Sequence, residues 1–187
     1  MEAESQARRC GECQLCCKLL PVEELGKLAG QRCKYSRCGK GCTIYAHRPE
    51  GCRLWDCWWL RGEDAEGLRR PDRVHYVIDT MPDYITTTDN ANPEAEPIKF
   101  VVAQVWVDPA YPDAHRDPAL RAWLEKGRTI AVIRYDGKNG FILCPPSRNE
   151  EGEWLERQSQ ALEEPSTLEK FQVLAGLGVE FSAVVTE

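Results

Sequence analysis

The run Cys10-Gly11-Glu12-Cys13-Gln14-Leu15-Cys16-Cys17 places four thiols within eight residues. A Cys-x-x-Cys turn holds two sulfurs where one metal ion can bind both, and two such turns overlap here. Adjacent cysteines point in different directions in most backbone conformations. We therefore expect Cys16 and Cys17 to serve two metals, or a metal and a bridge, with further ligands supplied from later in the chain.

The later cysteines are confined to the first third of the chain. The protein has 187 residues and ten cysteines, about twice what packing alone requires, and only Cys144 lies beyond residue 57. The N-terminal residues are polar and lack the apolar core of a secretion signal, so a cytoplasmic location is expected, where disulfides are rare. Metal ligation is the leading explanation for the clustered cysteines. The candidate ligands are Cys10, Cys13, Cys16, Cys17, Cys33, Cys38, Cys42, Cys52 and Cys57.

Charge divides the chain at the same place. Residues 1–60 carry ten Lys and Arg against seven Asp and Glu, whereas the whole chain has a net charge of −6. Two metal ions with four thiolates each would add about −4 to the first segment, and the nearby basic residues would offset it. This compensation is favoured over a nucleic-acid-binding surface, because the surplus of positive charge is small for contacts to phosphates.

After residue 62 the sequence changes to regular elements. Five segments rich in Val, Ile, Thr and aromatic residues predict β-strands, at 74–79, 84–88, 99–107, 129–135 and 140–144, with a hairpin turn over 136–140. One clear helix is predicted between the third and fourth strands, with Asp117 as its cap and Gly127 at its end. Shorter helices are predicted over 21–29 and 166–176.

These elements predict an α+β fold. An irregular, metal-stapled cysteine module over residues 1–61 is followed by an α+β region over 62–187, which has a small, mainly antiparallel sheet and one or two packed helices. The region is too small to bury much core alone, so we expect it to pack on the module as one unit. We expect the side chains of Trp55, Trp58 and Trp59 to be buried at that contact.

The cysteine pattern resembles a known family, the YkgJ-type CxxCxxCC cysteine-cluster proteins, which are described as zinc- or iron-chelating domains. The matching pieces are Cys10-x-x-Cys13-x-x-Cys16-Cys17, then Cys33, then Gly41-Cys42-Thr43-Ile44-Tyr45-x-x-Arg48-Pro49-x-x-Cys52-Arg53-x-x-x-Cys57. Longer members also carry pieces like Trp59-Leu60 and Arg70-Pro71-Asp72-Arg73. Where the family has a further cysteine close after Cys33, this chain has Ser36, and Cys38 follows two residues later. The resemblance implies metal chelation and assigns no biochemical process.

The identity of the metal stays open between alternatives. Four-thiolate sites suit zinc, whereas repeated Cys-x-x-Cys spacing with a remote cysteine also suits an iron–sulfur cluster in electron transfer or in assistance to another enzyme. A zinc-dependent nucleic-acid-binding module is the second alternative. Arg48 and Arg53 alternate with the last cysteines and are expected to stabilise the thiolates.

Motifs of other function classes are lacking. The sequence has no phosphate loop, no Gly-x-Ser-x-Gly elbow and no His-Glu-x-x-His helix, so a standalone enzyme is not expected. No apolar run approaches the length of a membrane span, so we expect no membrane partner. A protein partner is compatible with the composition, but nothing in the sequence identifies it.

Overall fold

The structure is a computed structural model, and it describes residues 8–62, 64–87, 94, 96, 98–135, 141–159 and 181–182. These residues form short helices and two β-sheets, which confirms the predicted α+β class. The helical elements are α1 (Leu15–Leu19), η1 (Glu23–Leu25), η2 (Tyr45–His47), α2 (Glu50–Leu54), α3 (Trp58–Arg61), α4 (Pro71–Val74), η3 (Pro112–Arg116) and α5 (Pro118–Lys126). The strands are β1 (Ser36–Arg37), β2 (Gly41–Cys42), β3 (Tyr76–Thr87), β4 (Ile98–Val107), β5 (Thr129–Arg134), β6 (Phe141–Cys144), β7 (Arg157–Ser159) and β8 (Phe181–Ser182).

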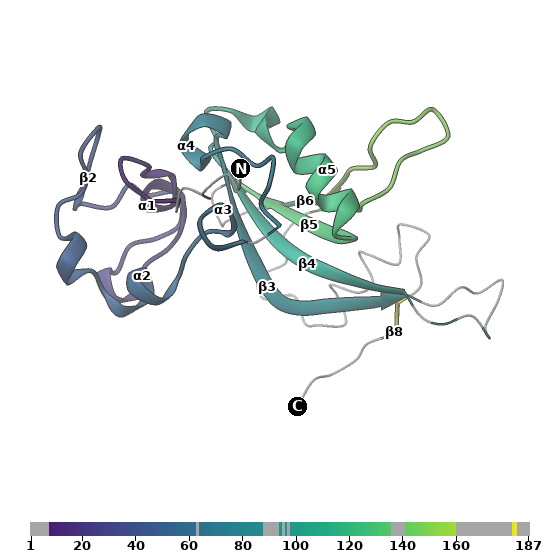
Figure 1. Cartoon of the computed structure of the whole chain (residues 1–187), viewed down its shortest axis with the longest axis horizontal. Helices are drawn as coiled ribbons and strands as arrows, with labels where there is room; N and C mark the ends of the chain where they lie inside the picture. The colour runs from purple at the N-terminus through teal and green to yellow at the C-terminus, as the bar shows by residue number, and fades with distance from the viewer. Residues whose placement is uncertain are drawn as a thin grey trace, which may run out of the picture.

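The larger sheet has the strand order β7-β6-β5-β4-β3-β8. Four of its five neighbouring pairs are antiparallel and the β4–β5 pair is parallel, which confirms the prediction of a mainly antiparallel sheet. The parallel pair arises because η3 and α5 carry the chain from the end of β4 back to the start of β5. In Figure 1 the long strands β3 and β4 cross the centre of the molecule, with the short elements around α1 and α2 at one end.

Helix α5 forms where the sequence predicts it. The Asp117 side chain accepts a hydrogen bond from the Ala119 backbone N–H at 2.9 Å, which satisfies one of the free donors at the helix N-terminus. Its apolar side buries Leu120, Trp123 and Leu124 against the sheet. The main core lies between this helix and the strands, and Val105, Ile133 and Cys144 are among its fully buried side chains. The same cluster contains Ala65, Leu68, Val74, Tyr76, Ile78, Ala103, Val107 and Ala131.

Two sequence predictions differ from the structure. The predicted strands 74–79 and 84–88 lie within one strand, β3, which changes register between Thr80 and Tyr84. The predicted helix over 21–29 is wrong: only the single turn η1 forms, because Gly26 adopts a left-handed conformation with φ 57°. That turn lets the Lys27 backbone N–H donate to the Val22 carbonyl at 3.0 Å, so the chain reverses where a helix would continue.

The N-terminal segment contacts the larger sheet directly. A second core cluster joins Leu15 and Leu19 of α1 to Val77 of β3 and Trp106 of β4. At the edge of this cluster, Lys18 makes an ion pair with Asp108 at 2.6 Å. The side of α1 that faces the sheet is therefore fixed by both apolar and charged contacts.

Trp55, Trp58 and Trp59 each contact the α+β region through a different interaction. The Trp55 indole N–H donates to the Asp79 carboxylate at 2.9 Å. Trp58 packs against Trp123 of α5 with a distance of 6.0 Å between ring centroids, and Trp59 packs on the main core. Each of them thus connects residues 55–59 to the sheet or to its covering helix.

Two predicted elements, the turn 136–140 and the helix 166–176, lie outside the described residues. The antiparallel pairing of β5 with β6 is present on either side of that turn. None of the helices in the described part of the chain is long and apolar enough to cross a membrane.

Candidate functional site

Eight of the ten cysteines line one cavity of about 520 Å³ in the N-terminal segment. They are Cys10, Cys13, Cys16, Cys17, Cys33, Cys42, Cys52 and Cys57. All have free thiols. The ninth candidate ligand, Cys38, is exposed in the turn between β1 and β2 and does not line the cavity, while Cys144 is fully buried in the main core. Eight of the nine candidate ligands thus converge, although they are spread over residues 10–57.

The first four cysteines are positioned by a turn and the helix that follows it. The Cys13 backbone N–H donates to the Cys10 carbonyl at 2.9 Å, which closes the first Cys-x-x-Cys turn. Cys16 and Cys17 then lie in the first turn of α1. Successive residues of an α-helix are rotated by about 100° about its axis, yet the thiols of Cys16 and Cys17 remain in hydrogen-bonding contact.

Later cysteines reach the cavity through tight backbone contacts. The Cys33 backbone N–H donates to the Cys17 carbonyl at 2.8 Å. Gly41 has φ 78°, and a Cβ built on it would lie 2.9 Å from the Gly11 carbonyl oxygen, so only glycine permits this approach. This contact brings β2 and its Cys42 beside the Cys-x-x-Cys turn.

Cys16 holds its proton between two thiolates. Hydrogen bonds to Cys10 and Cys17 raise the pKa of Cys16 well above 9, with burial acting in the same direction. The same hydrogen bonds lower the pKa of Cys10 and of Cys17 to about 7 against the opposing effect of burial. These three sulfurs are therefore in mutual contact, and two of them carry much of the negative charge near neutral pH.

Cys13 and Cys57 lie on the more buried side of the cavity. Burial raises the pKa of Cys57 to about 11, and the charges of Cys13 and Cys10 add to this increase. Burial also raises the pKa of Cys13, although the Leu15 and Asp72 backbone N–H groups donate to its sulfur and oppose the increase. The donor Asp72 belongs to the Arg70–Arg73 segment that also resembles the family, so this segment contacts the cysteine cluster.

A buried lysine lies beside the thiols, and sequence reasoning missed it. Lys27 is only 7% exposed, and its ammonium donates to the Leu20 and Leu28 carbonyls. Burial lowers the pKa of Lys27, while the charges of the thiols at Cys33, Cys17, Cys16 and Cys52 oppose that decrease. The sequence signal that could have identified Lys27 is its place directly after Gly26, between Cys17 and Cys33.

The two arginines predicted to stabilise the thiolates differ in position. Arg48 lines the cavity, donates to the Tyr45 carbonyl at 3.0 Å and helps to lower the pKa of Cys10 and Cys17. Arg53 is not among the described residues that line the cavity. The sheet supplies the opposite wall, with Trp106 and Asp79 beside Trp55.

The donor set fits a thiophilic metal. Eight thiols, two of them with pKa values near neutrality, face one cavity with backbone N–H donors and cations around them. As the side chains stand, no three His, Cys, Asp or Glu groups within the described residues are positioned to hold a metal ion between them. Ligation would therefore require the sulfurs to move closer together.

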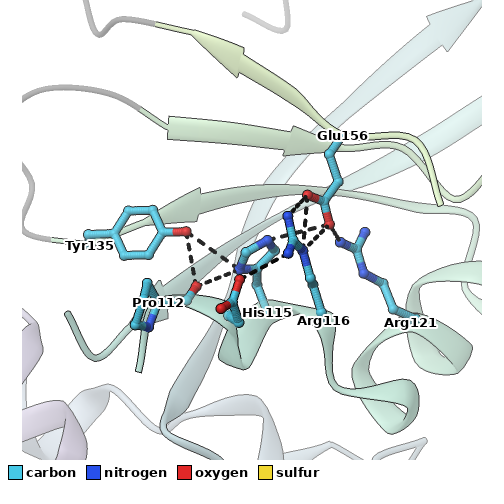
Figure 2. Close-up of polar contacts among 7 residues, drawn as sticks. Pro112, His115, Arg116, Arg121, Tyr135 and Glu156 are labelled. Carbon is cyan, nitrogen blue, oxygen red and sulfur yellow. Dashed lines mark hydrogen bonds and ion pairs between the residues drawn. The ribbon is translucent and has the colours of Figure 1, made fainter. Parts of the chain in front are cut away.

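A second polar cluster lies on the other side of the sheet, away from the thiols. Figure 2 shows Glu156 between Arg116, Arg121 and His115. Its carboxylate accepts from Arg116 at 3.0 Å and from Arg121, whose side chain is 2% exposed, and it lies 3.4 Å from His115 Nε2. This network ties the start of β7 to η3 and α5. The buried positions of His115 and Arg121 within it indicate a role in stability.

Comparison of the chain with protein-family models, with curated proteins and with solved structures found no match. The chemistry of the site is therefore read from its own side chains. Clustered thiols of this kind can bind a soft or borderline metal ion, or can form disulfides with one another. The buried lysine and the N–H donors to sulfur favour a role for the thiolate form.

Proposed function

We propose that this protein binds zinc through the thiolates of its cysteine cluster in a structural or chelating role, as its resemblance to the CxxCxxCC proteins implies. The observation that carries the proposal is the single cavity lined by eight cysteines from residues 10–57. Cysteines that served packing alone would have no reason to converge from five separate stretches of chain. Cys38, which is exposed outside the cavity, is left out of the proposed ligand set.

The surroundings of the thiols support this proposal. A zinc ion with four thiolates carries a net negative charge, which is favourable near cations and N–H donors. Lys27 and Arg48 supply the cations, and the Asp72 backbone N–H donates to the Cys13 sulfur.

The sparse secondary structure around the thiols also supports a structural role. Helices α1, α2 and α3 have only four or five residues each. Helices this short are not stable without tertiary contacts. Metal binding would supply folding free energy that such a segment otherwise lacks.

An iron–sulfur cluster is the second candidate, and the size of the cavity favours it. A space of about 520 Å³ lined by eight thiols exceeds what one four-thiolate ion requires. Repeated Cys-x-x-Cys spacing is also typical of cluster-binding proteins. In this case the protein would transfer electrons or assist another enzyme, and the bound group would be coloured.

Metal analysis and a visible spectrum of protein purified without oxygen test both candidates. We expect about two zinc ions per chain, from eight thiols at four per ion, and no visible absorbance. Cys17→Ser should lower the metal content, while the matched variants Cys38→Ser and Cys144→Ser should retain it. Brown protein containing iron and sulfide would favour the second candidate. Folded, metal-free protein with its cysteines paired as disulfides would contradict both.

A further inference from the structure

We infer that the eight cavity thiols form two separate four-thiolate metal sites, of which only one is coupled to the six-stranded sheet. This inference rests on the proposed metal binding and goes beyond it by assigning each ligand. The first thiol group is Cys10, Cys13, Cys16 and Cys57. The second thiol group is Cys17, Cys33, Cys42 and Cys52.

A second, smaller cavity is lined by the first thiol group and by none of the other thiols. Its volume is about 20 Å³, and the cysteines that line it are Cys10, Cys13, Cys16 and Cys57. The rest of its wall is apolar, from Trp59, Leu60, Pro71 and Val77. Such a volume is of the order of one water molecule, so these four thiols share one small space, and they would have to move closer together to hold a single ion there.

Contacts among the cysteines agree with this first group. The Cys10–Cys13 turn, closed by the hydrogen bond from the Cys13 N–H to the Cys10 carbonyl, holds two of them. Cys16 and Cys57 pack with the buried Cys13 in one core cluster. Each member of the first thiol group is thus connected to at least one other member.

The second thiol group is connected by a different set of contacts. The backbone of Cys33 bonds to that of Cys17 at 2.8 Å, and the β1–β2 hairpin places Cys42 opposite Ser36, whose N–H donates to the Cys33 carbonyl. Cys52 lies in α2 and lines the large cavity but not the small one. None of these four cysteines lines the small cavity.

Helix α1 explains why the boundary falls between adjacent residues. Cys16 and Cys17 are neighbours on the helix, so their side chains are rotated by about 100° from each other. Cys16 packs against the core cluster of Val77 and Trp106, whereas Cys17 does not belong to that cluster. The two groups meet at the thiols of Cys16 and Cys17, and again where Gly41 beside Cys42 approaches Gly11 of the Cys10–Cys13 turn.

Coupling to the sheet follows from the same core cluster. Cys13 is one of its buried members, and Cys16 and Cys57 pack against it beside Val77 and Trp106. No cysteine of the second thiol group is a member of this cluster in the described part of the chain. Loss of metal from the first site should therefore disturb β3 and β4, and loss from the second should not.

Cadmium-113 NMR of the full chain tests the ligand assignment without any substitution. We expect two ¹¹³Cd resonances, one coupled to the β-protons of the first thiol group and the other to those of the second. A sulfur coupled to both ions, or a different division of the eight cysteines, would overturn the inference while leaving metal binding intact. Failure of the reduced, folded protein to bind cadmium would instead overturn the proposed function.

Paired variants test the coupling. Cys57→Ser and Cys52→Ser remove one thiol from each group, and each should lose about half of the bound metal. Only Cys57→Ser should shift tryptophan fluorescence to longer wavelength and accelerate amide exchange at Trp106. The double variant of Cys10 and Cys57 should lose no more metal than Cys57→Ser, whereas the double variant of Cys52 and Cys57 should lose nearly all. Equal losses in the two double variants would indicate one shared cluster and would overturn the inference.

Discussion

Lys27 shows how one residue sets the charge of the cysteine-lined cavity. A buried lysine is usually costly, because its ammonium loses water that few protein groups can replace. Here the Leu20 and Leu28 carbonyls accept from the ammonium, and the charges on the nearby thiols favour its protonated form. The lysine and the thiolates therefore stabilise each other's charged states, and removing either should weaken the other.

We predict that Lys27→Met weakens metal binding by about tenfold, because the positive charge of Lys27 acts on the thiols of four proposed ligands. The residue Lys34 provides a matched control: it is exposed, and its ammonium lies 5.1 Å from the Tyr35 ring centroid. Lys34→Met should leave affinity unchanged in competition with a chromophoric chelator. Unchanged affinity in Lys27→Met as well would show that its charge does not act on the site.

At the level of elements, Glu156 is the contact that holds β7 to the helices covering the sheet. Burial alone would raise its pKa, but the hydrogen bond from Arg116 and the charges of His115 and Arg121 lower it below 4.5. The carboxylate is therefore ionised at neutral pH. It neutralises the guanidinium of Arg121, a buried residue of α5.

We expect Glu156→Gln to lower the free energy of unfolding by about 3 kcal/mol, because it leaves the buried Arg121 charge without its partner. This value is the lower end of the range for removing one partner of a buried ion pair, because the Gln side chain can still accept one hydrogen bond. Urea unfolding measures the effect. Glu150→Gln, at an exposed position, should change stability by less than about 0.5 kcal/mol. A loss as small in Glu156→Gln would mean that the network does not stabilise the fold.

Elements whose signals are local could be predicted from the sequence. The cap at Asp117 and the apolar stripe of α5 determine that helix, and segments rich in Val and Ile determine β4 and β5. The parallel pairing of β4 with β5 was not predicted, because it depends on how η3 and α5 turn the chain in space. Helices α2, α3 and α4 were also missed, since four or five residues carry no measurable periodicity.

The candidate site was predictable to a similar extent. Cysteine spacing predicted nine candidate ligands, eight of which line the cavity, whereas the thiols of Cys16 and Cys17 lie in contact although adjacent cysteines were expected to point apart. The exposed position of Cys38 could not be derived, because it depends on the β1–β2 pairing. The role of Lys27 depends on a left-handed turn at Gly26, and the glycine alone does not show that this turn places Lys27 beside the thiols.

On the scale of the whole molecule, charged and apolar contacts join the cysteine-rich segment to the sheet. Lys18 on α1 contacts both carboxylate oxygens of Asp108 at 2.6 Å, just beyond the end of β4. Trp55 donates to Asp79 within β3. The apolar cluster of Leu19, Val77 and Trp106 lies between these polar contacts, so movement of α1 would disturb both strands.

The Lys18–Asp108 contact should depend on pH. Burial raises the pKa of Asp108, but hydrogen bonds from Lys18 and from the Ala110 N–H outweigh it and bring the pKa below 3.8. A carboxylate with a lowered pKa in the folded state contributes stability that is complete above its unfolded pKa and is lost as the pH falls through the folded value.

We therefore predict that Asp108→Asn lowers the free energy of unfolding by about 1–3 kcal/mol at pH 6, the range for hydrogen bonds to charged groups. The difference from wild type should shrink as the pH falls below 3.8, where wild-type Asp108 also becomes neutral. Asp113→Asn is the control, because that carboxylate is 76% exposed. A difference that stays constant down to pH 3 would contradict the assignment.

Removal of metal from the wild-type protein should be felt in the sheet, and unequally along it. Val77 and Trp106 are register partners in β3 and β4, and they pack against the cysteines of α1 and its preceding turn. Ile133 of β5 belongs to the main core instead, under α5. We predict that a zinc chelator accelerates amide exchange at Val77 and Trp106 by at least about tenfold, which corresponds to about 1.4 kcal/mol of local opening free energy.

Exchange at Ile133 serves as the internal control for this experiment and should change much less, because α5 covers it whether or not the thiols hold metal. Protein treated with a chelator that had been saturated with zinc beforehand controls for direct effects of the reagent. Equal acceleration at all three amides would indicate that the molecule unfolds as one cooperative unit. No acceleration at Val77 and Trp106 would show that the cysteine-rich segment folds and opens independently of the sheet, so that α1 could release its metal without any change in β3 or β4.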